Sequence, residues 1–428
     1  MKRDALQQLE AWKQRARRKP LIIEGARQVG KTWLVKEFAK TSFHDDFVCI
    51  NFEEQTNMRN LFVTDFNITR ILDSISATAH RPITPGKTLI FFDEIQEAVH
   101  GLTALKYFCE NAPEYFVIAA GSLLGIELHK GDSFPVGKVN FMTLFPMSFS
   151  EFLNAMGEEP LWRFIENEDW ISVNIFKDKL KDLLRQYLYV GGMPESVLEF
   201  LESRDWKSVR EVQNEILKGY ENDFSKHAPA EVVPRIRQIW NSVPAQLSRE
   251  NRKFIFGLVK EGARAREYEV ALQWLKNAGI IYTVFNVKAP RIPLKSYENS
   301  SAFKVFINDV GLLGAMSRLD ASVIVNGNAI FTEFKGALTE QYVLQQLILK
   351  HTPYYYAKEN SRLEIDFLIE KDAAVYPVEV KAEENLKAKS LRQFSAEYNP
   401  PTAYRLSMSG YRKEEWLTNV PLFAAETL

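Results

Sequence analysis

The stretch Gly25-Ala26-Arg27-Gln28-Val29-Gly30-Lys31-Thr32 follows the pattern G-x-x-x-x-G-K-[ST] and decides the fold of the first part of the chain. Residues 20–24 lead into it with the composition of a strand, and residues 33–38 leave it with helical spacing. Glycines let backbone N–H groups close around phosphate oxygens, the lysine reaches the terminal phosphates, and the hydroxyl binds magnesium. We therefore predict that all eight residues bind ATP with Mg²⁺. The weaker alternative is a plain glycine turn between a strand and a helix.

Composition places the chain among ordinary globular proteins. Its 428 residues are enough for about three domains. The formal net charge of −1 argues against a surface that is basic throughout, while a local basic patch stays open. Cys49 and Cys109 lie in apolar surroundings, so we expect buried, reduced thiols. The N-terminus lacks the apolar core of a signal peptide, and the apolar stretch 115–128 is too short to span a bilayer. These features predict a cytoplasmic protein without a membrane partner.

A second nucleotide signature is the run 88–94, an unbroken apolar strand that ends in Asp93 and Glu94. Such a strand is buried on both faces of a parallel sheet, and its C-terminal end points into the ligand crevice. Asp93 is suited to hold magnesium, and Glu94 to polarise the attacking water as a general base. A third strand, 115–120, should lie between the first two, so that Ser122 after it senses the terminal phosphate. A simple strand-ending turn is the alternative for Ser122.

Three stretches resemble one family: the loop at 25–32, Phe-Phe-Asp-Glu-Ile-Gln at 91–96 and Ala-Gly-Ser-Leu-Leu-Gly at 120–125. They are similar to prokaryotic AAA-type P-loop ATPases with a C-terminal domain of unknown function. The turn at Pro194, Gly-Met-Pro, resembles the Gly-x-Pro turn of related signalling ATPases. In those proteins the proline touches the nucleotide, so the resemblance implies a nucleotide contact for Pro194. A helix-starting turn is the alternative. No arginine can be assigned as an arginine finger.

The middle of the chain is predicted to be helical. Residues 156–250 alternate apolar and charged positions at helical spacing, which predicts a helical lid on the ATPase. Residues 254–285 give the order helix, turn, helix and hairpin strand, which is the outline of a winged helix. Glu267 and Glu269 on its second helix would repel DNA, and winged helices in the resembling ATPases often pack on the nucleotide domain. DNA contact by this winged helix is the alternative. In that case, the residues that would contact DNA phosphates are Lys260, Arg264 and Arg266.

The last third contains a second constellation of charged residues. Glu340 lies in a predicted helix, Asp366 in an alternating strand, and Glu379 and Lys381 in the next strand. Glu379 and Lys381 share a face because strand side chains repeat every two residues. If the strands pair as a hairpin, Asp366 comes alongside Glu379. Two carboxylates converging on a divalent cation beside a lysine form a site for phosphodiester hydrolysis. The alternative is a surface hairpin whose charges are solvated.

This D-x12-E-x-K arrangement after a helical glutamate resembles nucleases of the restriction-endonuclease-like PD-(D/E)xK type. The resemblance covers about residues 330–410 and includes the order helix, three strands, helix and strand. It implies that Asp366, Glu379 and Lys381 are catalytic, and that the three carboxylates, Glu340 included, bind metal. Asp366 is preceded by isoleucine rather than proline, which departs from the pattern.

We thus predict an α/β protein with three parts. They are a P-loop AAA-type ATPase core (1–155), a helical lid and winged helix (156–290), and a restriction-endonuclease-like α/β domain (291–428). The leading hypothesis is an ATPase whose nucleotide state controls a nuclease-like domain acting on DNA or RNA. The alternative is a signalling or defence switch whose endonuclease-like fold binds a partner or nucleic acid without cutting. A protein partner or self-association also stays open, and a motor ATPase is a weaker hypothesis.

Overall fold

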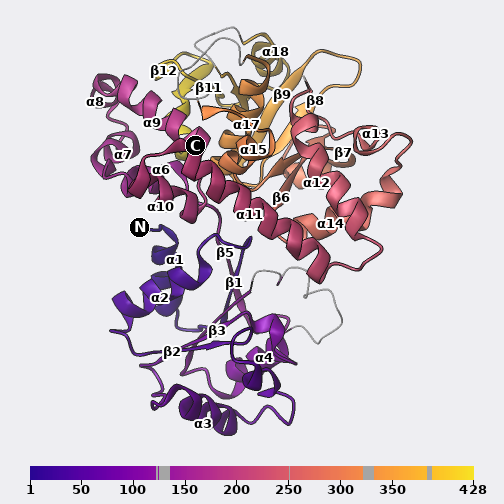
Figure 1. Ribbon diagram of the computed structural model, residues 1–428. Helices are drawn as coiled ribbons and strands as arrows, with labels where there is room; N and C mark the ends of the chain where they lie inside the picture. Colours follow the sequence, from indigo (N-terminus) through magenta and orange to yellow (C-terminus); the bar gives the residue numbers. More distant parts are fainter. Residues whose placement is uncertain (122–123, 125–134, 250, 322–331, 383–387) are drawn as a thin grey trace. The chain divides into compact units, whose positions relative to one another are not determined.

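The computed structural model describes residues 1–121, 124, 135–249, 251–321, 332–382 and 388–428 (Figure 1). The chain divides into two compact units. The smaller unit comprises Arg3–Phe145 and Asn277–Gly279, and the larger unit comprises Met1–Lys2, Pro146–Lys276 and Ile280–Leu428.

The smaller unit is built on a five-stranded parallel sheet with the strand order β2-β3-β4-β1-β5. Its strands are β1 Leu21–Glu24, β2 Phe47–Asn51, β3 Leu89–Asp93, β4 Phe116–Ala120 and β5 Asn140–Thr143. Its helices are α1 Ala5–Lys13, α2 Lys31–Ser42, α3 Ile68–Ala79 and α4 Gly101–Asn111, with short 3₁₀ turns at Thr56–Asn60 and Ile95–Glu97. The predicted parallel α/β core is confirmed.

Strand β3 is buried along its whole length, as its apolar sequence predicts. Successive side chains of a strand point to opposite faces, and both faces of β3 meet aromatic rings. Phe92 packs against Phe52 with ring centroids 5.8 Å apart, while Phe91 stacks on Phe47 at 6.3 Å. This packing on both faces fixes the C-terminal end of the strand, where Asp93 lies.

The larger unit begins with helices, which confirms the helical middle. These are α6 Phe149–Ala155, α7 Glu159–Glu166, α8 Trp170–Ile175, α9 Lys177–Val190, α10 Pro194–Ser203, α11 Trp206–His227, α12 Val233–Leu247, α13 Phe256–Val259 and α14 Ala265–Asn277. Helices α13 and α14 and the strand after them reproduce the order expected for residues 254–285.

A mixed eight-stranded sheet follows, in the order β12-β13-β11-β10-β9-β8-β6-β7. Its strands are β6 Ile281–Val287, β7 Glu298–Ile307, β8 Tyr354–Ala357, β9 Glu364–Lys371, β10 Ala374–Val380, β11 Ala403–Ser407, β12 Arg412–Lys413 and β13 Leu417–Pro421. The associated helices are α15 Val310–Met316, α17 Thr332–Leu347 and α18 Lys389–Tyr398, with 3₁₀ turns at Leu294–Tyr297 and Leu422–Thr427. The boundary expected near residue 290 lies between β6 and β7, which pair with each other.

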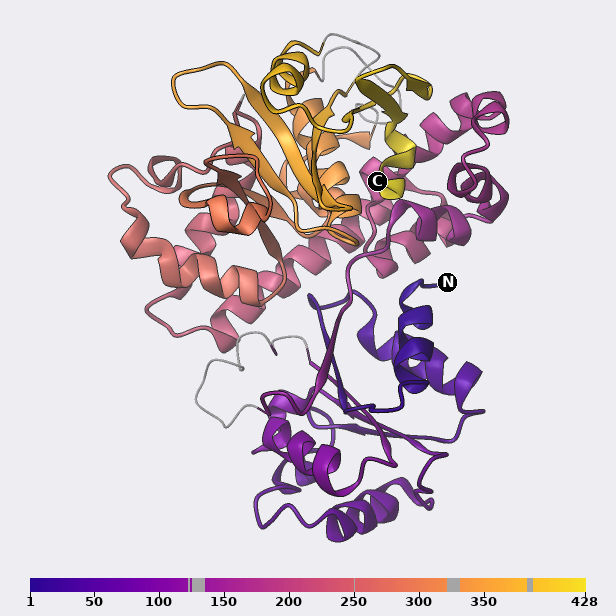
Figure 2. The same ribbon diagram turned by 180° about the vertical axis from the view of Figure 1, so that it is seen from behind.

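The predicted β9–β10 hairpin is present, with Val378 opposite Phe367. Helices α17 and α18 both pack against β10 (Figures 1 and 2). Ile365 of β9 belongs to a buried apolar cluster with Leu391 and Phe394 of α18. Because adjacent strand residues point to opposite faces, Asp366 is directed to the other face of the sheet.

Two expectations from composition can be compared with the structure. Cys49 and Cys109 are free thiols, but both are half-buried rather than buried. Within the ranges that the structure describes, no helix is both long and apolar enough to cross a membrane.

A buried carboxylate, Asp309, ties distant parts of the larger unit together. It accepts hydrogen bonds from the backbone N–H of Gly192 at 2.6 Å, from that of Leu312 at 3.1 Å and from the Gln345 amide at 3.2 Å. Burial raises the pKa of Asp309, and its N–H donors oppose that rise. The turn before α10 is held on its other side by Met147, whose N–H donates to the Gly192 carbonyl.

This close approach predicts that Gly192→Ala is strongly destabilising. A Cβ on Gly192 would lie 2.1 Å from the carbonyl oxygen of Met147, so the backbone must shift. We expect the free energy of unfolding of the larger unit to fall by at least about 2 kcal/mol, as in other overpacked sites. Denaturant titration measures it. Gly257→Ala is the matched control, because a Cβ there meets only Ile255 at 3.8 Å. Equal stability of the two variants would contradict this account of the turn.

Candidate functional site

The phosphate loop joins β1 to α2 and requires glycine where it begins. Gly25 has a φ of +143°, and a Cβ there would lie 2.3 Å from the carbonyl oxygen of Leu144. Gly30 has a φ of +93° immediately before α2. The free N–H groups and positive dipole of the helix N-terminus therefore point into the loop. The intervening predicted residues are Ala26 and Val29, both buried, Arg27, half-buried, and Gln28, exposed.

Lys31 is held over this loop by the loop's own backbone. Its ammonium donates to the carbonyl oxygens of Gly25 and Ala26, each at 2.8 Å. Burial lowers the pKa of Lys31 to about 8, although the charges of Glu94 and Asp93 oppose the shift. A buried ammonium bonded to neutral carbonyls gains stabilisation when an anion arrives.

The predicted magnesium residues lie in direct contact. The hydroxyl of Thr32 donates to the Asp93 carboxylate at 2.8 Å. Burial raises the pKa of Asp93, while the hydrogen bond from Thr32 lowers it. Strand β4 lies between β1 and β3, as the sequence predicted. A hydroxyl and a carboxylate are oxygen ligands of the kind that Mg²⁺ prefers, so these residues fit the ion.

Glu94 follows β3 in a left-handed conformation, with a φ of +49°. Its carboxylate accepts a hydrogen bond from the Gln96 amide at 2.5 Å. Gln96 was not predicted as a site residue, although it belongs to the quoted motif at 91–96. Ser122 lies outside the described residues, and Pro194 is the first residue of α10 in the larger unit. The roles of Glu94, Ser122 and Pro194 stay predictions.

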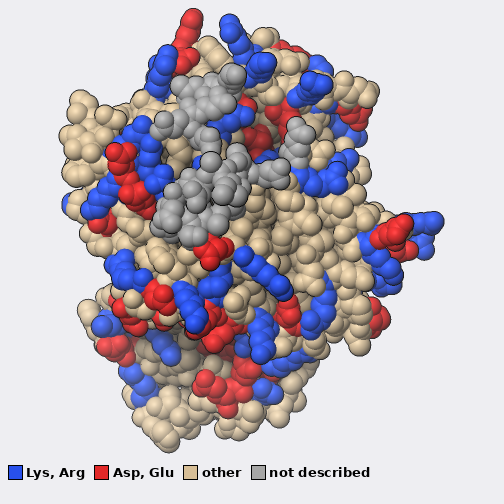
Figure 3. Space-filling model, turned by 45° about the horizontal axis from the view of Figure 1, so that its top comes forward, with Lys and Arg blue, Asp and Glu red and all other residues tan. Residues whose placement is uncertain are grey.

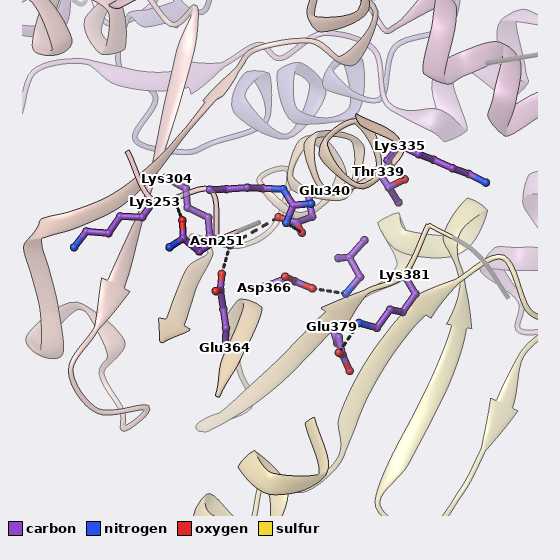
Figure 4. Close-up of polar contacts among 12 residues, drawn as sticks. Asn251, Lys253, Lys304, Lys335, Thr339, Glu340, Glu364, Asp366, Glu379 and Lys381 are labelled. Carbon is purple, nitrogen blue, oxygen red and sulfur yellow. Dashed lines mark hydrogen bonds and ion pairs between the residues drawn. The ribbon is translucent and has the colours of Figure 1, made fainter. Parts of the chain in front are cut away.

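The four residues of the second constellation come from α17, β9 and the end of β10 (Figure 4). Asp366 accepts a hydrogen bond from the backbone N–H of Val380 at 2.8 Å. The ammonium of Lys381 lies 2.8 Å from the Glu379 carboxylate. Glu340 is buried close enough to Asp366 for the charge of Asp366 to raise its pKa. The structure thus brings together the residues that the nuclease resemblance singled out, and their roles stay predictions.

Two cations that sequence-based prediction missed also enter this acidic site. Arg252 forms an ion pair with Glu340. Lys304 is fully buried in β7, 2.9 Å from the Glu364 carboxylate and 3.8 Å from that of Glu340. A lone lysine in the apolar run of residues 302–307 was the available signal for Lys304. Arg252 had no local signal, since its partner is 88 residues away.

These contacts set the charge state of the acidic site. Burial raises the pKa of Glu340 to about 8, and the neighbouring Asp366 charge adds to the rise. Lys304 and Arg252 act in the opposite direction. Burial also raises the pKa of Glu379, against the opposing hydrogen bond from Lys381. Across the described part of the chain, no group of three or more His, Cys, Asp or Glu residues is placed to hold a metal ion. The carboxylates face side-chain cations and an N–H group instead.

Comparison with known families agrees with the smaller unit. Residues 17–153 match the family model described as an AAA domain. Residues 181–323 and 335–423 match two models described as domains of unknown function, DUF8612 and DUF4143. The smaller unit is therefore an AAA-type P-loop domain, followed by two domains of unknown function.

Individual relatives are distant. An uncharacterized protein of Methanocaldococcus jannaschii is 24% identical over 357 residues, which cover 81% of this chain and 71% of that protein. The solved Walker-type ATPase of Pyrococcus abyssi is 15% identical, with a TM-score of 0.46, over 73% of this chain and 95% of that one. The Aeropyrum pernix ORC1 protein, solved in complex with DNA, is 12% identical, with a TM-score of 0.30, over 73% and 91%.

The low pKa of Lys31 predicts proton uptake when ATP binds. A triphosphate favours the charged ammonium and moves its pKa from about 8 back toward the ordinary 10.5. Binding at about pH 9 should therefore take up most of one proton, while binding at about pH 6.5 should take up none at this group. Calorimetry in buffers of different ionisation enthalpy measures the uptake. Lys36→Ala, an exposed change on the same helix, should retain it. Equal uptake at both pH values would contradict the assignment to Lys31.

Proposed function

We propose that the smaller unit binds and hydrolyses ATP with Mg²⁺, and that its nucleotide state controls a nuclease-like larger unit acting on nucleic acid. The observation that carries the ATPase is the 2.8 Å contact between Thr32 and Asp93. It joins a hydroxyl and a carboxylate 61 positions apart, which are the two protein groups that hold magnesium in P-loop NTPases.

The residues around this contact have separate tasks in hydrolysis. Lys31 exchanges its carbonyl partners for the terminal phosphates, and the N–H groups before α2 bind phosphate oxygens. Thr32 and Asp93 hold Mg²⁺, which supplies neutralisation of the phosphate charge. Glu94 accepts the proton of the attacking water, and Gln96 orients its carboxylate through the 2.5 Å hydrogen bond.

Glu94→Gln should separate binding from hydrolysis. We expect ATP affinity to be retained and turnover to fall at least ~100-fold, the scale of losing a general base. Lys31→Ala should lose most of the affinity itself. Steady-state phosphate release and equilibrium binding measure the two effects. Glu97→Gln is the matched control, because it makes the same change three residues on, at a carboxylate that pairs with Arg59. Turnover by Glu94→Gln equal to that of the parent would exclude Glu94 as the base.

Support for the nuclease-like larger unit comes from topology and from side-chain placement. Helix α17, strands β8, β9 and β10, helix α18 and strand β11 follow one another in the predicted order. Strand β10 pairs antiparallel with β9 and parallel with β11. Asp366 lies beside the backbone of Val380, next to Glu379 and Lys381. This arrangement supports action on phosphodiester groups.

The second candidate is a switch whose endonuclease-like fold binds nucleic acid or a partner without cutting. The ion pairs of Arg252 and Lys304 with Glu340 favour it, because side-chain cations take the place of a converged metal site. Under this switch hypothesis, ATP hydrolysis changes which nucleic acid or partner the larger unit binds. The difference between the candidates is whether any divalent ion supports cutting.

Cutting, if the protein performs it, depends on Asp366 and Lys381. We expect Asp366→Ala and Lys381→Ala each to abolish nicking of plasmid DNA with magnesium or manganese, while ATP turnover stays intact. Lys371→Ala, an exposed change at the end of β9, is the control and should still cut. Gel analysis of DNA and RNA substrates with and without ATP measures the activity. Failure of the parent protein to cut under all these conditions rules out the nuclease and leaves the switch.

A further inference from the structure

A cavity of about 770 Å³ opens beside the acidic site, within the size range of ligand pockets. Its walls come from two distant parts of the sequence. Arg249, Asn251 and Lys253 follow α12, whereas Tyr355 lies in β8 and Arg362 lies two positions before β9. The pocket therefore exists only because the segment after the helical region meets the C-terminal sheet within the larger unit.

The pocket is basic. Arg249, Lys253 and Arg362 line it and are exposed. Among the lining residues that the structure describes, Glu364 is the one acid, and the ammonium of buried Lys304 lies 2.9 Å from that carboxylate. The described part of the lining thus has three solvent-facing cations and an acid that is paired with Lys304. Such a surface attracts an anion rather than a cation.

The wall of the pocket adds a neutral polar group. Tyr355 is buried, and burial raises the pKa of its phenol to about 12. A phenol is protonated at neutral pH and can donate one hydrogen bond. Asn251 and Ser361 add further neutral polar groups to the lining. Charged and neutral donors together suit phosphate oxygens.

The pocket also leads toward the nuclease-like residues. Glu364 and Asp366 point to the same face of β9, because side chains alternate along a strand. Figure 4 shows Lys253 and Asn251 at one end of a row that continues through Glu364 and Asp366 to Lys381. A chain of phosphates bound in the pocket can therefore continue past Asp366.

We propose that this pocket binds the phosphodiester backbone of a nucleic acid strand and delivers it to the acidic site. The proposal rests on the proposed action of the larger unit on nucleic acid and identifies its anchor. On the face in Figure 3, basic and acidic side chains are interspersed, which agrees with the net charge of −1. Backbone contacts must therefore be local, and the anchor consists of Arg249, Lys253 and Arg362.

The test is binding without metal or ATP, so that neither cutting nor hydrolysis contributes. Fluorescence anisotropy with labelled single-stranded and duplex oligonucleotides in EDTA gives the Kd at several salt concentrations. We expect Arg249→Ala/Lys253→Ala to raise Kd at least ~10-fold, independently of sequence, and to reduce the slope of log K against log salt by about 2. Arg362→Ala should act in the same direction.

The matched control is Arg235→Ala/Lys207→Ala, which removes one arginine and one lysine at exposed positions outside the pocket. Circular dichroism checks folding.

The outcomes separate the pocket from the function on which it rests. Weaker binding by both pocket variants, with the control unchanged, supports the proposal. Parent-like binding by both pocket variants overturns the pocket while nucleic acid binding stands. Absence of binding by the parent overturns the action on nucleic acid together with the pocket. Displacement of the oligonucleotide by inorganic phosphate or polyglutamate at equal concentrations of anionic groups overturns the choice of nucleic acid as the ligand.

Discussion

The need to satisfy buried positive charge shapes both candidate sites. Lys31 in the smaller unit and Lys304 in the larger unit are both buried. Removing an ammonium from water is costly unless polar partners replace the water. Among the described residues, the hydrogen-bond partners of Lys31 are two carbonyl oxygens, and its pKa falls to about 8. Burial also disfavours the charged form of Lys304, but the Glu340 and Glu364 carboxylates outweigh it and the pKa of Lys304 is raised.

The two lysines therefore differ in how much an arriving anion could stabilise their ammonium groups. Lys31 is bonded to neutral carbonyl oxygens, so under the proposed function it is stabilised when phosphate oxygens replace them. Lys304 is already paired with two carboxylates, and removing both would leave a buried charge without compensation. Under the proposed function, the same residue type thus serves as a ligand contact in one unit and as a fixed part of the interior in the other.

Local sequence patterns predicted the parts of the structure that depend on residues close together in the chain. The loop before Lys31, the buried strand ending at Asp93 and the β9–β10 hairpin follow from spacing within a few residues. The distant residues that contact such segments could not be predicted from this spacing. Leu144 forces Gly25 to be glycine from more than a hundred positions away, and Asp309 holds Gly192 across 117 positions. Contacts of this kind depend on tertiary packing, which no local period of a single sequence encodes.

The same limit explains why the acidic site was only half predicted. Its carboxylates lie at motif spacing, but Arg252 and Lys304 come from elements outside the motif. Burial and Asp366 favour the protonated form of Glu340, whereas Arg252 and Lys304 favour its charged form. A divalent ion must therefore compete with a proton and with two side-chain cations for the same carboxylate. Arg252 lies between Asn251 and Lys253, which line the basic pocket. A phosphate bound there attracts the positive charge of this segment, so an anion in the pocket and a cation at Glu340 would favour each other's binding.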